Sequence, residues 1–269
     1  MKPLAILRPT HWIKNLIVFA PLFFSGTLYD PIRIWSTCVA FVAFCLVASG
    51  GYAWNDILDH AEDAKDERKK TRPLPSRTIS VMRAGIIGFS ATGGGLALAA
   101  AYAPASLGSI GIYVIASIFY STYIKRIAVL ELLFFPVFYL ARIFAGGAAA
   151  RTMPSHWLLL CVIFISLFIA VLKRRTEAGE TRYPKTFLNG MTSIFGATTL
   201  MSYGLYSILG AQSPYAIYSL FFPIAGIMRY FFLTEADTAG EFPERTITHD
   251  PFMATIIICW IAFMYAIIY

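Results

Sequence analysis

Residues 33–63 read RIWSTCVAFVAFCLVASGGYAWNDILDHAED, an apolar run that continues directly into an acidic segment. The run at 33–54 is long enough to cross a hydrocarbon core about 30 Å thick as an α-helix. If the helix continues for two more turns, four polar side chains share one face, within an arc of about 100°. These four are Asn55, Asp56, Asp59 and Asp63.

The rest of the chain repeats the apolar pattern. Of its 269 residues, 58% are hydrophobic and 14% charged, and a mean hydropathy of +0.65 excludes an ordinary soluble domain. The pattern predicts an all-α polytopic membrane bundle of about nine transmembrane helices, forming a single transmembrane domain over 1–269. The predicted spans lie near residues 13–29, 33–54, 79–101, 104–124, 128–149, 155–173, 187–210, 214–234 and 250–269.

Basic residues predict the orientation of the bundle. Except for Arg33, Arg142 and Arg151, every Lys and Arg falls before the first span, at its start, or near the connections that follow the second, fourth, sixth and eighth spans. Because basic loops stay on the cytoplasmic side, we expect a cytoplasmic N-terminus and a non-cytoplasmic C-terminus in the cell (inner) membrane. The same bias accounts for the net charge of +7, so no nucleic acid partner is expected.

The acidic face after residue 54 suggests a metal site. Three carboxylates on one face repel one another unless a divalent cation holds them, and Mg²⁺ binds both carboxylate oxygens and substrate phosphate oxygens. Lys69 and Arg72 follow shortly after Asp63 in the sequence and would complement the negative charge of those phosphates. A solvated loop in which acids and bases merely pair with each other remains the alternative. The expected Mg²⁺ ligands are Asn55, Asp56, Asp59 and Asp63.

The segment NDILDHAED (55–63), followed by KKTRPL (69–74), resembles the first signature of the UbiA superfamily of intramembrane transferases. The resemblance implies a nine-helix fold and Mg²⁺-dependent transfer at the cytoplasmic face. Aromatic prenyltransferases of that superfamily carry a second Asp-rich motif, which is not found here. Basic residues stand at the corresponding places instead, in YSTYIKR (120–126) and KRRTE (173–177).

That difference resembles one branch, the decaprenyl-phosphate phosphoribosyltransferases. Further matching segments are LRPTHWIKN (7–15), ARIFAG (141–146), RY (229–230) and HDP (249–251). The branch resemblance implies transfer of 5-phosphoribose from phosphoribosyl pyrophosphate to a polyprenyl phosphate embedded in membrane lipid. Three places depart from the branch pattern: Glu131 replaces Asp, Asp66-Glu67 replaces His-Pro, and Arg77 stands where Gly is common.

The motifs and the resemblance together assign roles. Arg142 lies inside a predicted span, so it should face a polar cavity, where it binds substrate or pairs with Glu131 or Asp250. Lys14 either orients a phosphate or extends to the membrane interface. The expected catalytic residues are Asp56, Asp59, Lys69, Arg72, Lys125 and Arg142, and the expected substrate-binding residues are Lys14, Asn15, Tyr120, Lys173, Arg174 and Arg229.

Three function classes stay open. Phosphoribosyl transfer needs no general base, because the acceptor phosphate is already an anion, and it should invert the anomeric carbon. Prenyl transfer from a prenyl diphosphate to an aromatic acceptor would call for a second carboxylate cluster. A non-enzymatic transporter would call for inverted repeats or broken helices. Faces of small residues make a homo-oligomer possible, and glycines at 93–95 and 146–147 favour close helix packing over phosphate loops.

Overall fold

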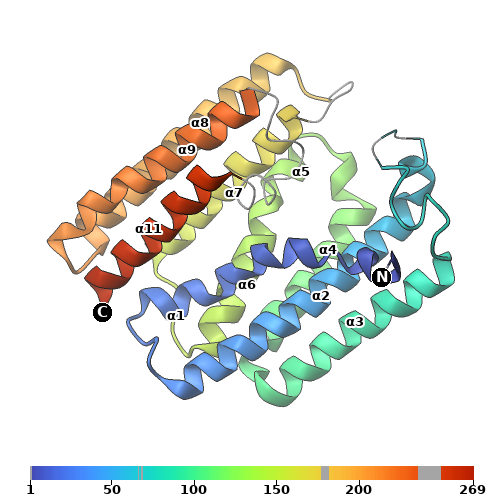
Figure 1. The fold of residues 1–269 in the computed structure, drawn as a ribbon, viewed down its shortest axis with the longest axis horizontal. Coiled ribbons are helices and arrows are strands. Elements are labelled where there is room, and N and C mark those ends of the chain that lie inside the picture. The colour runs from blue at the N-terminus through green and yellow to red at the C-terminus, as the bar shows by residue number, and fades with distance from the viewer. Residues whose placement is uncertain (1, 66, 68, 177–181, 236–249) are drawn as a thin grey trace. The chain divides into compact units, whose positions relative to one another are not determined.

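The computed structural model describes residues 2–65, 67, 69–176, 182–235 and 250–269. All regular secondary structure in these ranges is helical, which confirms the predicted all-α class (Figure 1). The chain divides into two compact units. Unit 1 comprises residues 1–126 and 141–153, and unit 2 comprises 127–140 and 154–269, and one of the three boundaries falls inside a helix. The single domain expected over 1–269 stays a prediction.

Seven of the described helical segments are long and apolar enough to span a membrane, which confirms a multi-pass membrane protein. They are Pro31–Asp63, Val81–Tyr102, Pro104–Arg126, Leu130–Ala149, His156–Arg175, Pro214–Thr234 and Pro251–Ile268. The two remaining predicted spans are not among these seven. The first is a 3-10 helix η2 (Pro9–Phe19) followed by α1 (Ala20–Phe24), and the other is the α-helix α8 (Lys185–Leu205) followed by a short π-helix η5 (Tyr206–Gly210).

Unit 1 is built around α2. Its helices are η1 (Lys2–Leu7), η2, α1, α2 (Pro31–Asp63), α3 (Val81–Tyr102), η3 (Pro104–Ser106), α4 (Leu107–Thr122), η4 (Ile124–Arg126) and the later part of α6 (Phe135–Ala149). Unit 2 contains α5 (Leu130–Leu133), the start of α6, α7 (His156–Thr176), α8, η5, η6 (Pro214–Leu220), α9 (Phe221–Glu235) and α11 (Pro251–Ile268).

The start of helix α2 follows from its sequence. The carboxylate of Asp30 accepts the N–H groups of Ile32 and Arg33 at 3.0 and 3.2 Å, and Pro31 occupies the first helical position. The helix then runs unbroken to Asp63. The predicted two-turn extension beyond the apolar run is therefore confirmed, and the acidic segment is helical.

Glycines allow α3 to pack closely beside α2 (Figure 1). A Cβ at Gly50 would overlap the Thr92 hydroxyl and lie 2.7 Å from the Gly88 carbonyl oxygen. A Cβ at Gly95 would lie 2.7 Å from the Ala43 carbonyl oxygen. Contacts this short leave no room for a side chain, so small residues set the distance between the two helices.

The N-terminal segment docks along α2 through polar side chains. Trp12 donates to the Ser49 hydroxyl at 2.9 Å, and Asn15 donates to the Cys45 sulfur at 3.2 Å. A Cβ at Gly146 of α6 would overlap the backbone of this segment. Polar bonds of this kind replace water inside a membrane, where an unpaired polar group is costly.

Apolar contacts anchor the loop that joins α2 to α3. Leu74 and Ile79 of the loop pack with Ile6 of η1, Ala53 of α2 and Ala84 of α3. All five side chains are at most 6% exposed. The loop that carries Lys69 and Arg72 is thus held against the acidic end of α2.

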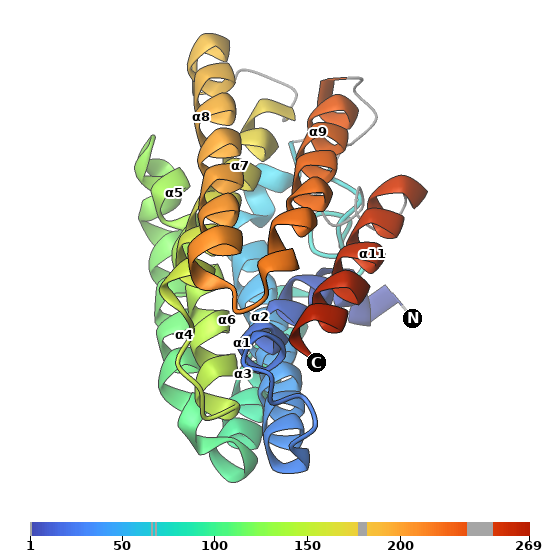
Figure 2. The same ribbon diagram turned by 90° about the vertical axis from the view of Figure 1, so that its left-hand side faces the viewer.

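In unit 2, α7 packs beside α8 and α9 beside α11 (Figure 2). In the interior of unit 2, the Tyr203 hydroxyl of α8 connects three helices. It accepts from Trp260 of α11 at 2.7 Å and lies 2.6 Å from the Ser219 hydroxyl of η6. Asp250 caps α11 by accepting the Met253 N–H at 2.8 Å. Both features satisfy polar groups that would otherwise face lipid or protein interior.

Candidate functional site

The acidic end of α2 binds two arginines. Asp56 and Asp63 are 2% and 4% exposed, and one guanidinium serves both: Arg72 Nη1 lies 2.6 Å from Asp63 Oδ2 and 3.7 Å from Asp56 Oδ1. Arg8 forms a further ion pair with Asp56, and Lys69 lies 3.8 Å from Asp63. The sequence-predicted residues Asp56, Asp63, Lys69 and Arg72 are therefore brought together.

A second set of contacts adjoins the first on the same helix face. Asn55 donates to Asp59 at 2.9 Å, and Lys125 forms an ion pair with the other oxygen of Asp59. The Ser121 hydroxyl donates to the Asn55 amide oxygen at 3.2 Å. Asp56, Asp59 and Asp63 all lie on the last turns of α2, and Arg72 contacts two of them; we call these three carboxylates, with the partners named above, the acidic cluster.

The fold positions three of the cations that contact these acids, Arg8, Arg72 and Lys125. Arg72 precedes the buried Leu74 in a tight turn, in which the Ser76 N–H donates to the Arg72 carbonyl oxygen at 3.0 Å. Lys125 follows the buried Ile124 directly after α4. Arg8 has a left-handed backbone, with φ of 46°, and its guanidinium lies over the Tyr52 ring. A non-glycine residue in this conformation is uncommon and marks a constrained position.

Arg8 and Ser121 are the members of the cluster that the sequence reasoning did not assign to the site. Arg8 is separated from Asp56 by 48 positions. Its place in the LRPTHWIKN segment was the available signal. Ser121 lies inside YSTYIKR between two assigned residues, Tyr120 and Lys125.

The donor set fits a hard cation. Asn55, Asp56, Asp59 and Asp63 offer only carboxylate and amide oxygens, which Mg²⁺ prefers. Within the described residues no three such side chains converge on one point, because each carboxylate is turned toward a cationic side chain. The carboxylate oxygens that pair with basic side chains in this structure are therefore the same oxygens that would bind a metal.

Arg142 is buried in unit 1 at 3% exposure. Its Nε donates to the Asn15 amide oxygen at 2.7 Å, and Nη2 lies 3.4 Å from the Tyr113 hydroxyl. The guanidinium also lies over the rings of Phe44 and Tyr113, at 5.1 and 4.8 Å from their centroids. An amide and two aromatic faces thus hold this intramembrane charge. The candidates Arg142 and Asn15 are in direct contact.

Two further candidates belong to the same unit. Tyr120 is half-buried in the last turns of α4, directly before Ser121. Lys14 is half-buried in η2. It directly precedes Asn15, which accepts from Arg142.

Unit 2 holds the candidates that follow α7. Arg174 donates to Glu131 Oε2 at 2.5 Å, and the Tyr183 hydroxyl donates to Glu131 Oε1 at 3.0 Å. Lys173 is half-buried in the same helical turn as Arg174. Glu131 is therefore the partner of Arg174, and Tyr183 is a contact that the sequence reasoning did not assign.

Arg229 forms a two-pronged bond to Asp250, at 3.3 and 2.7 Å, and lies over the rings of Phe232 and Phe252. Hydrogen bonding to Arg229 holds the pKa of the Asp250 carboxyl below its ordinary value. The pair connects α9 to the first turn of α11. His249, which precedes Asp250 in the sequence, lies outside the described residues.

The departures from the branch pattern have different structural settings. Arg77 has φ of 55°, a conformation that glycine would adopt without strain. Glu131 retains a carboxylate and uses it to bind Arg174. Asp66 lies outside the described residues, whereas Glu67 forms an exposed ion pair with Lys70.

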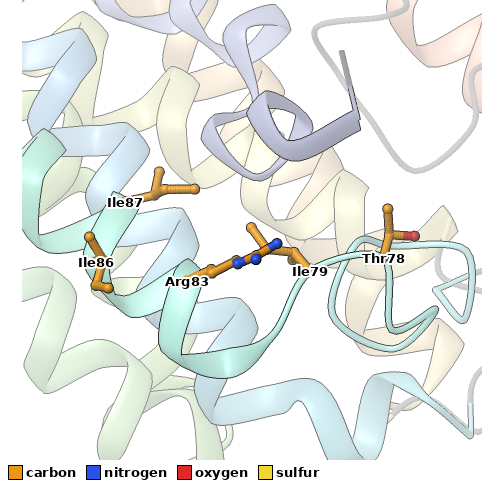
Figure 3. A pocket seen from close by; sticks show the side chains of 5 residues that line it. All are labelled: Thr78, Ile79, Arg83, Ile86 and Ile87. Atoms are coloured by element: carbon orange, nitrogen blue, oxygen red, sulfur yellow. The ribbon is translucent and has the colours of Figure 1, made fainter.

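A shallow pocket lies at the start of α3 (Figure 3). Its volume is about 180 Å³, and Arg83 extends across it from the first turn of α3. Ligand sites usually have about 300–1,000 Å³, and none of the candidate residues lines this one. The pocket is therefore separate from the acidic cluster. Its lining is Thr78, Ile79, Arg83, Ile86 and Ile87.

Sequence comparison places the chain among known proteins. Residues 16–177 match the UbiA prenyltransferase family. The decaprenyl-phosphate phosphoribosyltransferase of Mycolicibacterium smegmatis is 32% identical, over 98% of this chain and 91% of that protein. The protein of the same name from Mycobacterium tuberculosis is 30% identical, over 95% of this chain and 90% of that protein.

Solved structures show the same fold. A UbiA homolog from Archaeoglobus fulgidus, bound to DMAPP and Mg²⁺, has a TM-score of 0.75 at 20% identity, covering 100% of this chain and 99% of the homolog. The matched family covers more than half of the chain, and the relatives align over nearly all of it. This multi-pass membrane protein belongs to the UbiA prenyltransferase family.

Proposed function

We propose that this protein is a membrane phosphoribosyltransferase. It transfers 5-phosphoribose from phosphoribosyl pyrophosphate to a polyprenyl phosphate, such as decaprenyl phosphate, and releases pyrophosphate. The observation that carries the proposal is the similarity to decaprenyl-phosphate phosphoribosyltransferases over 95–98% of this chain. The acidic cluster of α2 supports it, because a densely anionic donor requires a metal and several cations together.

The carboxylates of the cluster would hold the metal. Bound Mg²⁺ would supply positive charge to the pyrophosphate as its bond to ribose weakens. The cations that pair with these acids would contact phosphate oxygens of the donor. The proposed ligands are Asn55, Asp56, Asp59 and Asp63, and the proposed phosphate contacts in the cluster are Arg8, Lys69, Arg72 and Lys125.

The transfer itself needs little chemistry from the protein. The bond between ribose C1 and the pyrophosphate oxygen breaks, and its electron pair leaves with pyrophosphate. An oxygen of the acceptor phosphate forms the new bond to C1 from the opposite face, so the anomeric carbon is inverted. Because that oxygen is already anionic, no side chain has to remove a proton. The cations stabilise the charge that builds up on the leaving group.

The other substrate-binding residues predicted from the sequence are also proposed as phosphate contacts. They are Lys14, Asn15, Tyr120, Arg142, Lys173, Arg174 and Arg229. The distribution of basic residues supports a cytoplasmic N-terminus, a non-cytoplasmic C-terminus and an active site that faces the cytoplasm. The soluble donor then arrives from the cytoplasm, and the lipid acceptor from the membrane.

Prenyl transfer is the second candidate. It is favoured by the fold shared with the DMAPP-bound homolog. The sequence argues against prenyl transfer. Lys125 after α4 and Arg174 at the end of α7 stand where a second Asp-rich motif would carry carboxylates.

A transfer assay separates the two. Purified protein in detergent receives Mg²⁺, decaprenyl phosphate and radiolabelled phosphoribosyl pyrophosphate, and label is counted in the lipid phase. The proposal predicts labelled lipid with wild-type protein and none with Asp56→Ala. If no lipid is labelled, but 4-hydroxybenzoate is prenylated when a prenyl diphosphate replaces the donor, the protein is a prenyltransferase.

A further inference from the structure

A strained turn lies directly before α5. Val129 has φ of 67° and ψ of −47°, and the Leu130 N–H donates to the Ala128 carbonyl oxygen at 2.8 Å. These values define a γ-turn of the rare, strained kind, here centred on a β-branched residue. Such a turn persists only when its surroundings hold it, and it occurs mainly at functional sites.

A buried phenol contacts this turn through two hydrogen bonds. The Tyr183 hydroxyl accepts the Val129 N–H at 2.8 Å and donates to Glu131 Oε1 at 3.0 Å. The Tyr183 ring is 5% exposed and packs with Leu132 and Leu188. Burial raises the pKa of this phenol, so the hydroxyl stays protonated and remains a donor to the carboxylate.

The Glu131 carboxylate also binds a cationic side chain. Glu131 is 4% exposed and accepts from Arg174 through its second oxygen, at 2.5 Å. A buried carboxylate that bonds through both oxygens has a fixed orientation. The hydroxyl of Tyr183 therefore helps to fix the position in which Glu131 holds the guanidinium of Arg174.

We propose that Tyr183 is a positioning residue for Arg174, acting through Glu131 and the turn at Val129. The inference rests on the proposed function, in which Arg174 contacts phosphate oxygens of the donor. The phenol preorganises that contact, and the strained turn fixes the start of the short helix that carries Glu131.

The test measures pyrophosphate binding to the full-length protein with Mg²⁺ by calorimetry. Pyrophosphate is the product of phosphoribosyl transfer and of prenyl transfer alike, so the probe serves whichever donor is used. Tyr183→Phe removes only the hydroxyl and should weaken binding about tenfold. Arg174→Ala should weaken it at least as much, and the double variant no further than Arg174→Ala alone. In the transfer assay, Tyr183→Phe should raise KM for phosphoribosyl pyrophosphate more than it changes kcat.

A matched control separates positioning from stability. Tyr203→Phe removes another buried phenolic hydroxyl of the same unit, and should lower thermal stability while leaving pyrophosphate affinity unchanged. If Tyr183→Phe does not fold, Val129→Gly is added to relieve the strain of the unsupported turn, and the tenfold loss is still expected.

The outcomes distinguish the two proposals. Wild-type affinity in Tyr183→Phe together with weak binding in Arg174→Ala overturns the positioning role and leaves the proposed function standing. If Arg174→Ala binds pyrophosphate with wild-type affinity, Arg174 does not contact the phosphate, and the positioning role of Tyr183 is overturned as well. No binding by the wild-type protein overturns the proposed function and this inference together.

Discussion

Replacing Arg72 by Ala should both destabilise the protein and impair transfer. Its guanidinium lies 2.6 Å from Asp63 and 3.7 Å from Asp56, two carboxylates that are 4% and 2% exposed. Removing one partner of a buried ion pair costs about 3–5 kcal/mol. Asp56 keeps Arg8 and Asp63 keeps Lys69, so we expect roughly half of that, about 2 kcal/mol.

Thermal unfolding in detergent, followed by tryptophan fluorescence, measures the stability change. Adding Asp63→Asn to Arg72→Ala removes the charge left without its arginine and should recover most of the lost stability. Transfer should remain at least about tenfold below wild type in both variants, because a charge-assisted phosphate contact is missing. The reasoning is refuted if Arg72→Ala unfolds at the wild-type temperature, or if the second substitution lowers stability further.

Other predictions concern separate features. Asp59→Ala should abolish Mg²⁺-dependent transfer while unfolding near the wild-type temperature, and retained activity would exclude Asp59 from the metal site. Gly50→Ala should cost about 1–3 kcal/mol in thermal unfolding, because its methyl group would overlap a side chain of α3. Gly93→Ala meets nothing within 4 Å and should leave stability unchanged or raise it by up to about 1 kcal/mol, and equal effects of the two changes would contradict the packing. Arg142→Leu should reduce kcat/KM more than thermal stability, and a pure stability loss would indicate a structural role. The lowered pKa of Asp250 stabilises the fold above the ordinary aspartate pKa, and this stability should be lost as pH falls through the lowered value; Asp250→Asn should remove that acid dependence, and an unchanged pH profile of unfolding would contradict it.

The sequence predicted the main scaffold because hydropathy and helical periodicity are local properties. The apolar run of α2 and the common face of its acids depend only on residues close in sequence, and both the all-α class and the helical extension to Asp63 are confirmed. Packing at glycines was predicted in part. Gly95 and Gly146 lie against neighbouring backbone, whereas a Cβ at Gly93 or Gly94 would meet nothing within 4 Å.

The pairing of acids with cations was not predictable in the same way. Arg8 reaches Asp56 only because η1 packs against α2 and the following loop, an arrangement that depends on tertiary contacts of Ile6, Leu74 and Ile79. Hydropathy also does not distinguish a 3-10 helix from an α-helix, so the form of the first predicted span could not be foreseen.

In unit 2 the missed residue was Tyr183. Its partner Glu131 is 52 positions away, and no local pattern marks a tyrosine as the support of a distant turn. The strain at Val129 becomes visible only from backbone angles. The Tyr183–Glu131 contact and the conformation of Val129 could therefore be found only from the tertiary structure.

The central claim is that the acceptor is a lipid phosphate and the transferred group is phosphoribose. Phosphorus NMR of the lipid extract, after incubation of wild-type protein with Mg²⁺, phosphoribosyl pyrophosphate and decaprenyl phosphate, tests both at once. The account predicts that the lipid phosphomonoester signal is replaced by a phosphodiester signal, together with one phosphomonoester signal from the ribose 5-phosphate, and that Asp56→Ala shows neither change. A lipid phosphate that stays a monoester while the donor is consumed, or a donor that is not consumed at all, would contradict the account.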